Sequence, residues 1–215
     1  MNLSTVKSNL FDPARPTSLS GRARARRWGE FQQAFPDLEQ MRVLDLGGTP
    51  GYWENAPVRP ASVRCVNLDP GHPSSDASWI ECTVADACEP QPGQYDLVVS
   101  NSCIEHVGGH ERRLRFCETV RAAADRHWVQ TPYRYFPIEP HWVFPGFQFL
   151  PAPARIRISK SWPLGHIRST VDSAWADVSW VELLSISDMR GYFPDSTLWL
   201  ERWAGVVKSL VAVAR

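Results

Sequence analysis

Lysine is scarce in this chain of 215 residues: only Lys7, Lys160 and Lys208 are lysines, and arginine supplies the other basic side chains. This bias is typical of a GC-rich bacterial genome. The 23 basic and 23 acidic residues cancel, so no overall charge draws the protein to nucleic acid or to an anionic membrane. Long apolar runs are missing too, so we expect no signal peptide and no membrane span.

Cysteine pairs of the metal-binding kind are also missing. The five cysteines are odd in number and form no C-x-x-C motif, which argues against a disulfide framework and against a zinc site. We therefore expect no metal centre, and a reducing cytoplasm as the location of the protein.

Short apolar runs rich in β-branched residues alternate with helical segments over the first part of the chain. Helical periodicity covers 20–38, where three aromatic residues share a face, and 110–124. Strands alternating with helices predict a parallel sheet covered on both faces. The expected strands are 41–46, 62–68, 78–84, 95–101 and 126–131.

The end of the chain has a different pattern. Ser185 followed by Asp188 predicts a helix start, and the segments 196–203 and 208–215 read as an antiparallel pair of strands. We therefore expect an α/β fold, a Rossmann-like, doubly wound, mostly parallel seven-stranded sheet with a C-terminal antiparallel hairpin.

Three regions follow from this pattern. Residues 1–19 are expected to be a mobile lead, and residues 20–215 a single domain. Within that domain, residues 132–182 fit no regular period and are crowded with proline and aromatic side chains, which is typical of a lid or substrate-binding insertion.

The stretch MRVLDLGGTPGYW, residues 41–53, leads from a strand into a glycine turn. It lacks the dinucleotide fingerprint G-x-G-x-x-G, because Thr49 and Tyr52 occupy its second and third glycine positions. Asp45 would repel phosphates but can hold an ammonium group. S-adenosylmethionine carries an ammonium group and no phosphate, so the turn favours that cofactor over a dinucleotide.

On these residues the chain resembles class I S-adenosylmethionine-dependent methyltransferases, of the broad small-molecule group called type 11. The resemblance covers residues 41–131 and is supported by the terminal hairpin. It implies that the acid after the second strand binds the ribose hydroxyls, that the acid after the third strand contacts the adenine amino group, and that the end of the fourth strand borders the cofactor. The implied cofactor-binding residues are Asp45, Gly47, Gly48, Thr49, Gly51, Asp69, Asp86, Asn101 and Ser102.

Two segments are candidates for the acceptor side of the reaction. His106 follows the fourth strand, and a histidine there can take a proton from a hydroxyl nucleophile or can merely shape the loop. Glu139 and His141, two positions apart between prolines, can form an acid–base pair or tie down the insertion. The predicted catalytic residue is His106, and the predicted substrate-binding residues are Glu105, Tyr133, Arg134, Glu139 and His141.

The sequence therefore predicts a methyltransferase acting on a small molecule, such as a sugar, a lipid-linked glycan or a secondary metabolite, with transfer to oxygen favoured slightly. A nucleic-acid methyltransferase is the alternative enzyme, although the neutral charge balance disfavours it. A non-catalytic cofactor-binding protein is the alternative from another class, since the Thr49 side chain can crowd the cofactor. The oligomeric state stays open.

Overall fold

The computed structural model describes residues 19–69 and 74–215. The chain divides into two compact units, residues 1–36 and residues 37–215. Residues 1–18 of the expected mobile lead lie outside the described residues, and the expected boundary of a single domain at residue 20 stays a prediction.

The first unit contains the helix α2, Leu19–Ala34. Its aromatic residues contact one another, with ring centroids 5.2 Å apart for Trp28 and Phe31 and 5.1 Å apart for Phe31 and Phe35. The helix ends four residues before the expected position because Pro36 disfavours helical backbone at the residue before it.

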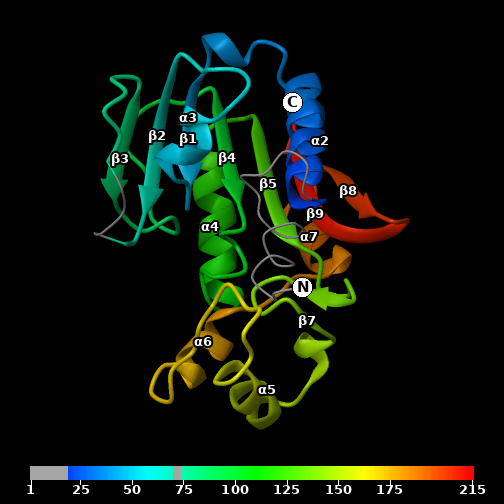
Figure 1. Ribbon diagram of the computed structural model, residues 1–215. Helices are drawn as coiled ribbons and strands as arrows, with labels where there is room; N and C mark the ends of the chain where they lie inside the picture. Colours follow the sequence, from blue (N-terminus) through cyan, green and yellow to red (C-terminus); the bar gives the residue numbers. More distant parts are fainter. Residues whose placement is uncertain (1–18, 70–73) are drawn as a thin grey trace. The chain divides into compact units, whose positions relative to one another are not determined.

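The second unit is built on a seven-stranded sheet with the order β3-β2-β1-β4-β5-β9-β8 (Figure 1). The short helix η1, Leu38–Gln40, precedes the first strand. Neighbouring strands from β3 to β5 are all parallel, so their carboxyl ends meet at one edge of the sheet. These strands are β1 (Arg42–Leu46), β2 (Ser62–Asn67), β3 (Ile80–Val84), β4 (Leu97–Asn101) and β5 (His127–Pro132).

The last two strands, β8 (Thr197–Trp203) and β9 (Val206–Ala214), form an antiparallel hairpin, and β9 is also antiparallel to β5. Ala204 and Gly205 connect them in left-handed backbone conformations, at φ 48° and 83°, as a tight hairpin turn requires. The predicted fold class is thereby confirmed: the sheet is mostly parallel and ends in an antiparallel pair.

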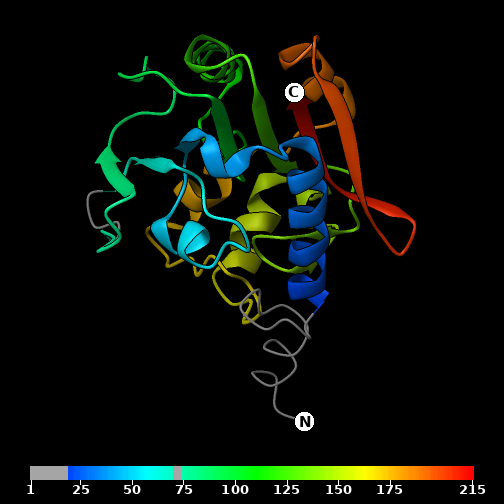
Figure 2. The same ribbon diagram turned by 90° about the horizontal axis from the view of Figure 1, so that it is seen from above.

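Helices flank the sheet on both faces (Figure 2). The helices α4 (His110–Ala123) and α7 (Ile186–Tyr192) pack beside each other on one face, and α3 (Pro50–Glu54) lies on the other. The main core forms between the sheet and α4 and α7, where Leu44, Leu46 and Phe116 are fully buried. Ser185 caps α7 through a reciprocal pair of hydrogen bonds with Asp188, as predicted.

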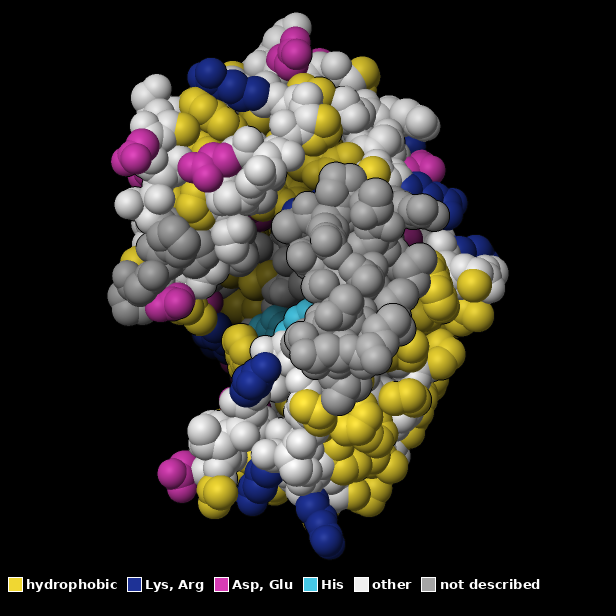
Figure 3. All heavy atoms as spheres, in the orientation of Figure 1, with side chains coloured by type: hydrophobic (Ala, Val, Ile, Leu, Met, Phe, Trp, Pro, Cys, Tyr) yellow, Lys and Arg dark blue, Asp and Glu magenta, His cyan; other side chains and the backbone are white. Residues whose placement is uncertain are grey.

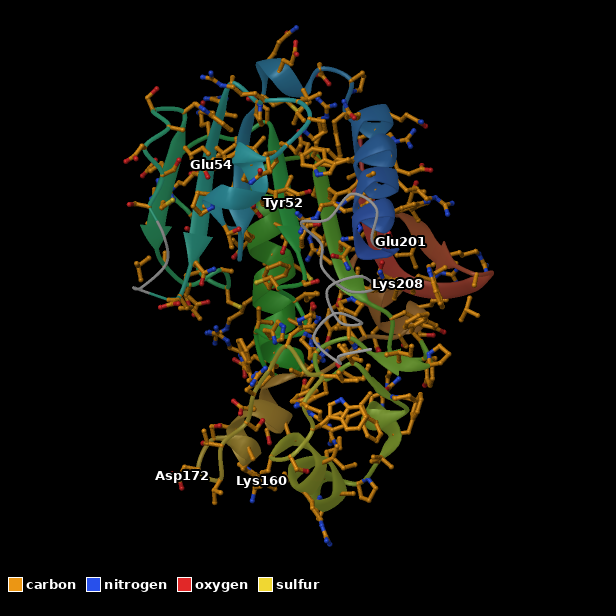
Figure 4. The ribbon with its side chains drawn as sticks, viewed as in Figure 1. Tyr52, Glu54, Lys160, Asp172, Glu201 and Lys208 are labelled. Carbon is orange, nitrogen blue, oxygen red and sulfur yellow. The ribbon has the colours of Figure 1, made fainter. Side chains whose placement is uncertain are left out.

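The insertion lies beyond the carboxyl ends of the parallel strands, and its labelled residues Lys160 and Asp172 mark the end farthest from the sheet (Figures 1 and 4). A separate hydrophobic cluster holds it together, with the rings of Trp142 and Phe147 stacked at 4.5 Å. Its role as a lid stays a prediction. The insertion contains β6 (Ile138–Glu139), β7 (Phe144–Pro145), η2 (Phe147–Phe149), α5 (Ala152–Ser159) and α6 (Ala174–Trp180).

Among residues 19–69 and 74–215, no helix combines the length and the apolar character that crossing a bilayer requires. All five cysteines lie in this part of the chain and are free thiols, which agrees with the expectation that they form no disulfide.

Candidate functional site

The acid that precedes the glycine turn is enclosed by protein. Asp45 is 1% exposed, and one of its carboxylate oxygens, Oδ2, accepts a hydrogen bond of 2.7 Å from the indole N–H of Trp53. Burial raises the pKa of Asp45 to about 7, although the bond from Trp53 acts in the opposite direction. The other oxygen, Oδ1, is buried and has no hydrogen-bond partner in the part of the chain that the structure describes.

Two glycines of the turn are required by close contacts. A Cβ atom on Gly48 would lie 2.0 Å from Oδ2 of Asp45. Gly47 has φ +80°, and a Cβ atom there would lie 2.7 Å from the Cβ and Sγ atoms of Cys103. The turn is therefore packed directly against the acid and against the segment after β4.

The threonine and the proline of the turn start the helix α3. Thr49 is the N-cap residue in extended conformation, and Pro50 occupies the first turn, where the missing N–H group of a proline has no intrahelical partner to lose. The Thr49 side chain is exposed and makes no capping hydrogen bond. Tyr52 and Glu54, labelled in Figure 4, follow on the same helix.

The two predicted acids after β2 and β3 lie in different surroundings. Asp69 is exposed, and its backbone N–H donates to the side-chain oxygen of Asn67 at 3.2 Å. Asp86 forms a bidentate ion pair with Arg112 at 2.8 and 2.9 Å and accepts the N–H of Cys88. Burial raises the pKa of Asp86, but the bonds from Cys88 and Arg112 outweigh it and hold that pKa below its usual value. Both oxygens of this carboxylate are therefore already in contact with Arg112; its predicted contact with adenine stays a prediction.

The end of β4 brings polar groups beside the turn. Ser100 donates to the carbonyl oxygen of Leu46 at 2.8 Å and so ties β4 to β1. Ser102 has a left-handed backbone at φ 55°, a conformation that costs on the order of 1–3 kcal/mol in a residue other than glycine. The side-chain oxygen of Asn101 is buried and has no hydrogen-bond partner within the described ranges.

His106 and His141 meet although they come from different segments. Their Nε2 atoms lie 3.1 Å apart, and one of the two carries the shared hydrogen. The Nδ1–H group of His141 donates to Glu139 at 2.6 Å, and the second oxygen of Glu139 accepts the backbone N–H of Trp142 at 2.8 Å. The structure thus joins both predicted acceptor-side segments in one chain of contacts, Glu139–His141–His106.

The two histidines differ in their affinity for a proton. Burial, together with the charge on His141, lowers the pKa of His106 to about 4. Burial also lowers the pKa of His141, but the hydrogen bond and charge of Glu139 outweigh it, so that pKa lies above its usual value. The Nδ1 atom of His106 is buried and Nε2 faces His141, so an acceptor hydroxyl reaches His106 only if its neighbours move. The predicted role of His106 as a base stays a prediction.

Glu105 lies beside the two histidines and is fully buried. Thr131 donates to its Oε2 atom at 2.9 Å, and burial raises the pKa of this carboxyl group above its usual value. One ligating atom from each of Glu105, His106 and His141 lies within 4.8 Å of the others, which is close enough for the three to share a metal ion.

A cavity of about 390 Å³ opens next to this cluster, with Glu139 and Trp142 in its wall. Arg113, Arg134 and Arg155 also line it, and of these Arg113 is paired with Glu182. The other lining residues are Phe147, Gln148, Val181, Glu182, Leu183 and Asp188. Figure 3 shows histidine side chains within a hollow on one face of the molecule.

The remaining predicted acceptor residues divide between this cavity and the sheet edge. Arg134 lines the cavity. Tyr133 is not among the lining residues; it forms a parallel β-bridge with Leu184, and its ring contacts Tyr135 at 5.6 Å.

Several partners of the site were not foreseen from the sequence: Trp53, Cys103, Arg112, Thr131 and Trp180, whose ring lies 4.2 Å from that of His106. None of these five residues belongs to a recognisable sequence motif. Arg112 alone has a position that points to the site: it lies in the first turn of α4, which starts at His110 soon after the fourth strand.

A family model described as a methyltransferase domain matches residues 20–132. No curated protein has a sequence that matches this chain. Solved structures of the same fold include an S-adenosylmethionine-dependent methyltransferase from Listeria monocytogenes, with a TM-score of 0.57 and 12% identity over 88% of this chain and 97% of that chain. Another, from Mesorhizobium loti, has a TM-score of 0.57 and 14% identity over 91% of this chain and 99% of that chain.

The magnesium protoporphyrin IX methyltransferase of Synechocystis PCC 6803, solved with bound S-adenosylhomocysteine, has a TM-score of 0.53 and 13% identity over 90% of this chain and 84% of that chain. Identities this low show a shared fold, whereas the family match rests on more than half of the chain. The chain belongs to the methyltransferase domain family and has the fold of S-adenosylmethionine-dependent methyltransferases.

Proposed function

We propose that this protein transfers the methyl group of S-adenosylmethionine to a hydroxyl group of a small, anionic acceptor. The observation that carries the proposal is the contact between His106 and His141 beside the carboxyl edge of the sheet. Ligands of open α/β sheets bind at this edge, so the polar cluster and the glycine turn of β1 face one common region.

The residues of the turn fit the cofactor. Oδ1 of Asp45 and the side-chain oxygen of Asn101 are buried acceptors without a donor among the described residues, and the cofactor's ammonium group would supply donors. Thr49 leaves the turn open, since its side chain is exposed. Asp69 follows the neighbouring strand, where a carboxylate can accept the two ribose hydroxyls. The bound cofactor supplies a methyl group on a positively charged sulfur.

The acceptor would bind in the cavity of about 390 Å³, a size within the range of small-molecule sites. Arg134 and Arg155 line it, and neither forms an ion pair with a carboxylate in residues 19–69 and 74–215. Of the acids in the same wall, Glu182 is paired with Arg113 and Glu139 with His141. Asp188 accepts from Ser185 and offsets part of the positive charge of Arg134, so with these pairs counted the wall keeps an excess of one positive charge. The cavity therefore favours a carboxylate or phosphate on the acceptor.

The transfer is an in-line displacement. The acceptor hydroxyl gives up its proton at the Glu105, His106, His141 and Glu139 cluster, and its oxygen forms a bond to the methyl carbon. The bond between that carbon and sulfur breaks, and its electron pair stays on sulfur, leaving an uncharged thioether. The protein's task is to align oxygen, carbon and sulfur and to keep water away.

Incubation with methyl-labelled S-adenosylmethionine and fractionated bacterial extract tests the proposal. We expect label in an anionic small-molecule fraction, in a bond stable to alkali as an ether is. The double variant Arg134→Ala/Arg155→Ala should lower transfer and spare cofactor binding, whereas Lys160→Ala, at the far end of the insertion, should change neither. If calorimetry shows that the folded protein binds neither S-adenosylmethionine nor S-adenosylhomocysteine, the proposal is wrong.

A further inference from the structure

Three side chains of metal-binding type converge at the acceptor side of the site. One ligating atom from each of Glu105, His106 and His141 lies within 4.8 Å of the other two. They come from the loop after β4 and from the segment after β6, so two separate parts of the fold hold them together. Two imidazoles and a carboxylate form a common donor set for divalent transition-metal ions.

The orientation of His141 matches that of a metal ligand. Its Nδ1–H donates to Glu139, so in the neutral imidazole the lone pair of Nε2 faces His106. A carboxylate behind a ligating histidine is the usual arrangement in metal sites, because it fixes the tautomer and the ring plane. The two Nε2 atoms lie 3.1 Å apart, near the separation of about 3.3 Å for two imidazoles on tetrahedral zinc.

Glu105 supplies an independent reason to expect a cation. It is fully buried, Thr131 occupies its Oε2 atom, and Oε1 has no hydrogen-bond partner in the described part of the chain. A buried acceptor left without a partner is costly to stability. The chain of contacts Glu139–His141–His106 does not use this oxygen, whereas a bound cation would.

The charges of the buried carboxyl groups also favour a bound cation. Glu105 and Glu139 are both buried, at 0% and 1% exposure, and Glu139 contacts the imidazole of His141. Buried carboxyl groups need compensating positive charge if they are to be ionised. A divalent ion would neutralise both.

We infer that Glu105, His106 and His141 bind one divalent transition-metal ion, with Glu139 as the positioning residue for His141. In this arrangement His106 is a ligand instead of a free base. If the proposed function holds, the ion would also bind the acceptor hydroxyl and lower its pKa. The hydroxyl would then give up its proton while bound at this cluster, and the proton would pass to water before the oxygen attacks the methyl group.

Metal binding is measured directly, without any transfer assay. The tag-free protein is stripped with a chelator and titrated with Co²⁺ by visible absorption and with Zn²⁺ by calorimetry. We expect one equivalent of either ion to bind, with cobalt bands typical of a four- or five-coordinate site. The variants Glu105→Gln and His141→Asn should bind at least tenfold more weakly. His110→Asn, a histidine outside the cluster, should bind as the wild type does.

Circular dichroism shows whether each variant is folded, and the wild-type titration is informative even if a variant is not. A folded wild type that binds neither ion, or equal affinities in all four proteins, overturns the inference. Binding of the ion without any methyl transfer would leave the inference standing and contradict the proposed function. Transfer that proceeds in the stripped protein at an unchanged rate contradicts the role of the ion in the reaction.

Discussion

His106 and His141 are 35 positions apart in the sequence, yet their Nε2 atoms lie 3.1 Å apart. This contact connects the loop after β4, which packs against the glycine turn at Gly47, to the insertion, which lines the cavity of about 390 Å³.

Glu139→Gln should uncouple His141 from its carboxylate. The amide keeps the size of the side chain but removes the charge that holds the Nδ1 hydrogen of His141, so we expect the rate of transfer to fall about 10- to 100-fold with little change in cofactor affinity. Nitrogen NMR of the imidazole should show a change in the tautomer balance of His141. Glu111→Gln, on the surface of α4, is the control, and an unaltered tautomer in Glu139→Gln would contradict the assigned role.

Gly48→Ala and Gly51→Ala form a matched pair. The new Cβ atom at position 48 would lie 2.0 Å from the Asp45 carboxylate, whereas the one at position 51 would meet nothing within 4 Å. We expect Gly48→Ala to lower the free energy of unfolding by about 3 kcal/mol and Gly51→Ala to change it by less than about 1 kcal/mol. Denaturant unfolding followed by circular dichroism measures both. Equal losses would show that the contact with Asp45 is unimportant.

Asp45 should make stability depend on pH in an unusual direction. Its pKa in the folded protein is about 7, above the value in an unfolded chain, so its protonated form favours folding at low pH. That contribution is lost as the pH rises from about 4 through about 7, a change on the order of 4 kcal/mol. The Asp45→Asn variant lacks this titrating group. The difference in free energy of unfolding between the wild type and the variant should therefore change by about 4 kcal/mol as the pH rises through this range.

Chemical denaturation of the cofactor-free protein and of Asp45→Asn, at about pH 5 and about pH 8, measures this difference. Parallel pH profiles for the two proteins would mean that Asp45 stays ionised in the fold. The Trp53→Phe variant lacks the indole donor to Oδ2, a hydrogen bond that lowers the pKa of Asp45. In this variant the loss of stability should therefore extend to higher pH than in the wild type.

Asp69→Ala should weaken cofactor binding. Two hydrogen bonds from ribose hydroxyls to a carboxylate are worth about 1.5–3 kcal/mol, so the dissociation constant of S-adenosylmethionine should rise about 10- to 100-fold. Asp172→Ala, which removes an acid at the far end of the insertion, is the control. Calorimetric titration gives both constants, and equal affinities would remove Asp69 from the cofactor site.

The sheet could be predicted because each strand carries its own signal. The run around Val98 is apolar and rich in β-branched residues, which predicts a strand. Ser185 and Asp188 together predict a helix start, because both lie within four residues. The strands of the structure match these patterns with shifts of one or two residues at their ends.

The site was harder to predict, because its contacts join distant segments. The sequence shows Asp45 and Trp53 as neighbours in a turn but does not show that an indole N–H donates to the carboxylate. Likewise, the sequence indicates that Glu139 and His141 form a polar pair. Their contact with His106 depends on the backbone path of the insertion, whose sequence has no helical or strand periodicity. That path is set by its own aromatic packing, which no short motif encodes.

The insertion has a hydrophobic cluster, around Trp142 and Phe147, that is separate from the core between the sheet and α4. A substitution in this cluster would reshape the cavity wall while the sheet keeps its packing. Acceptor preference and the stability of the cofactor-binding half can thus change independently, so that relatives with the same glycine turn can differ in the molecules they methylate.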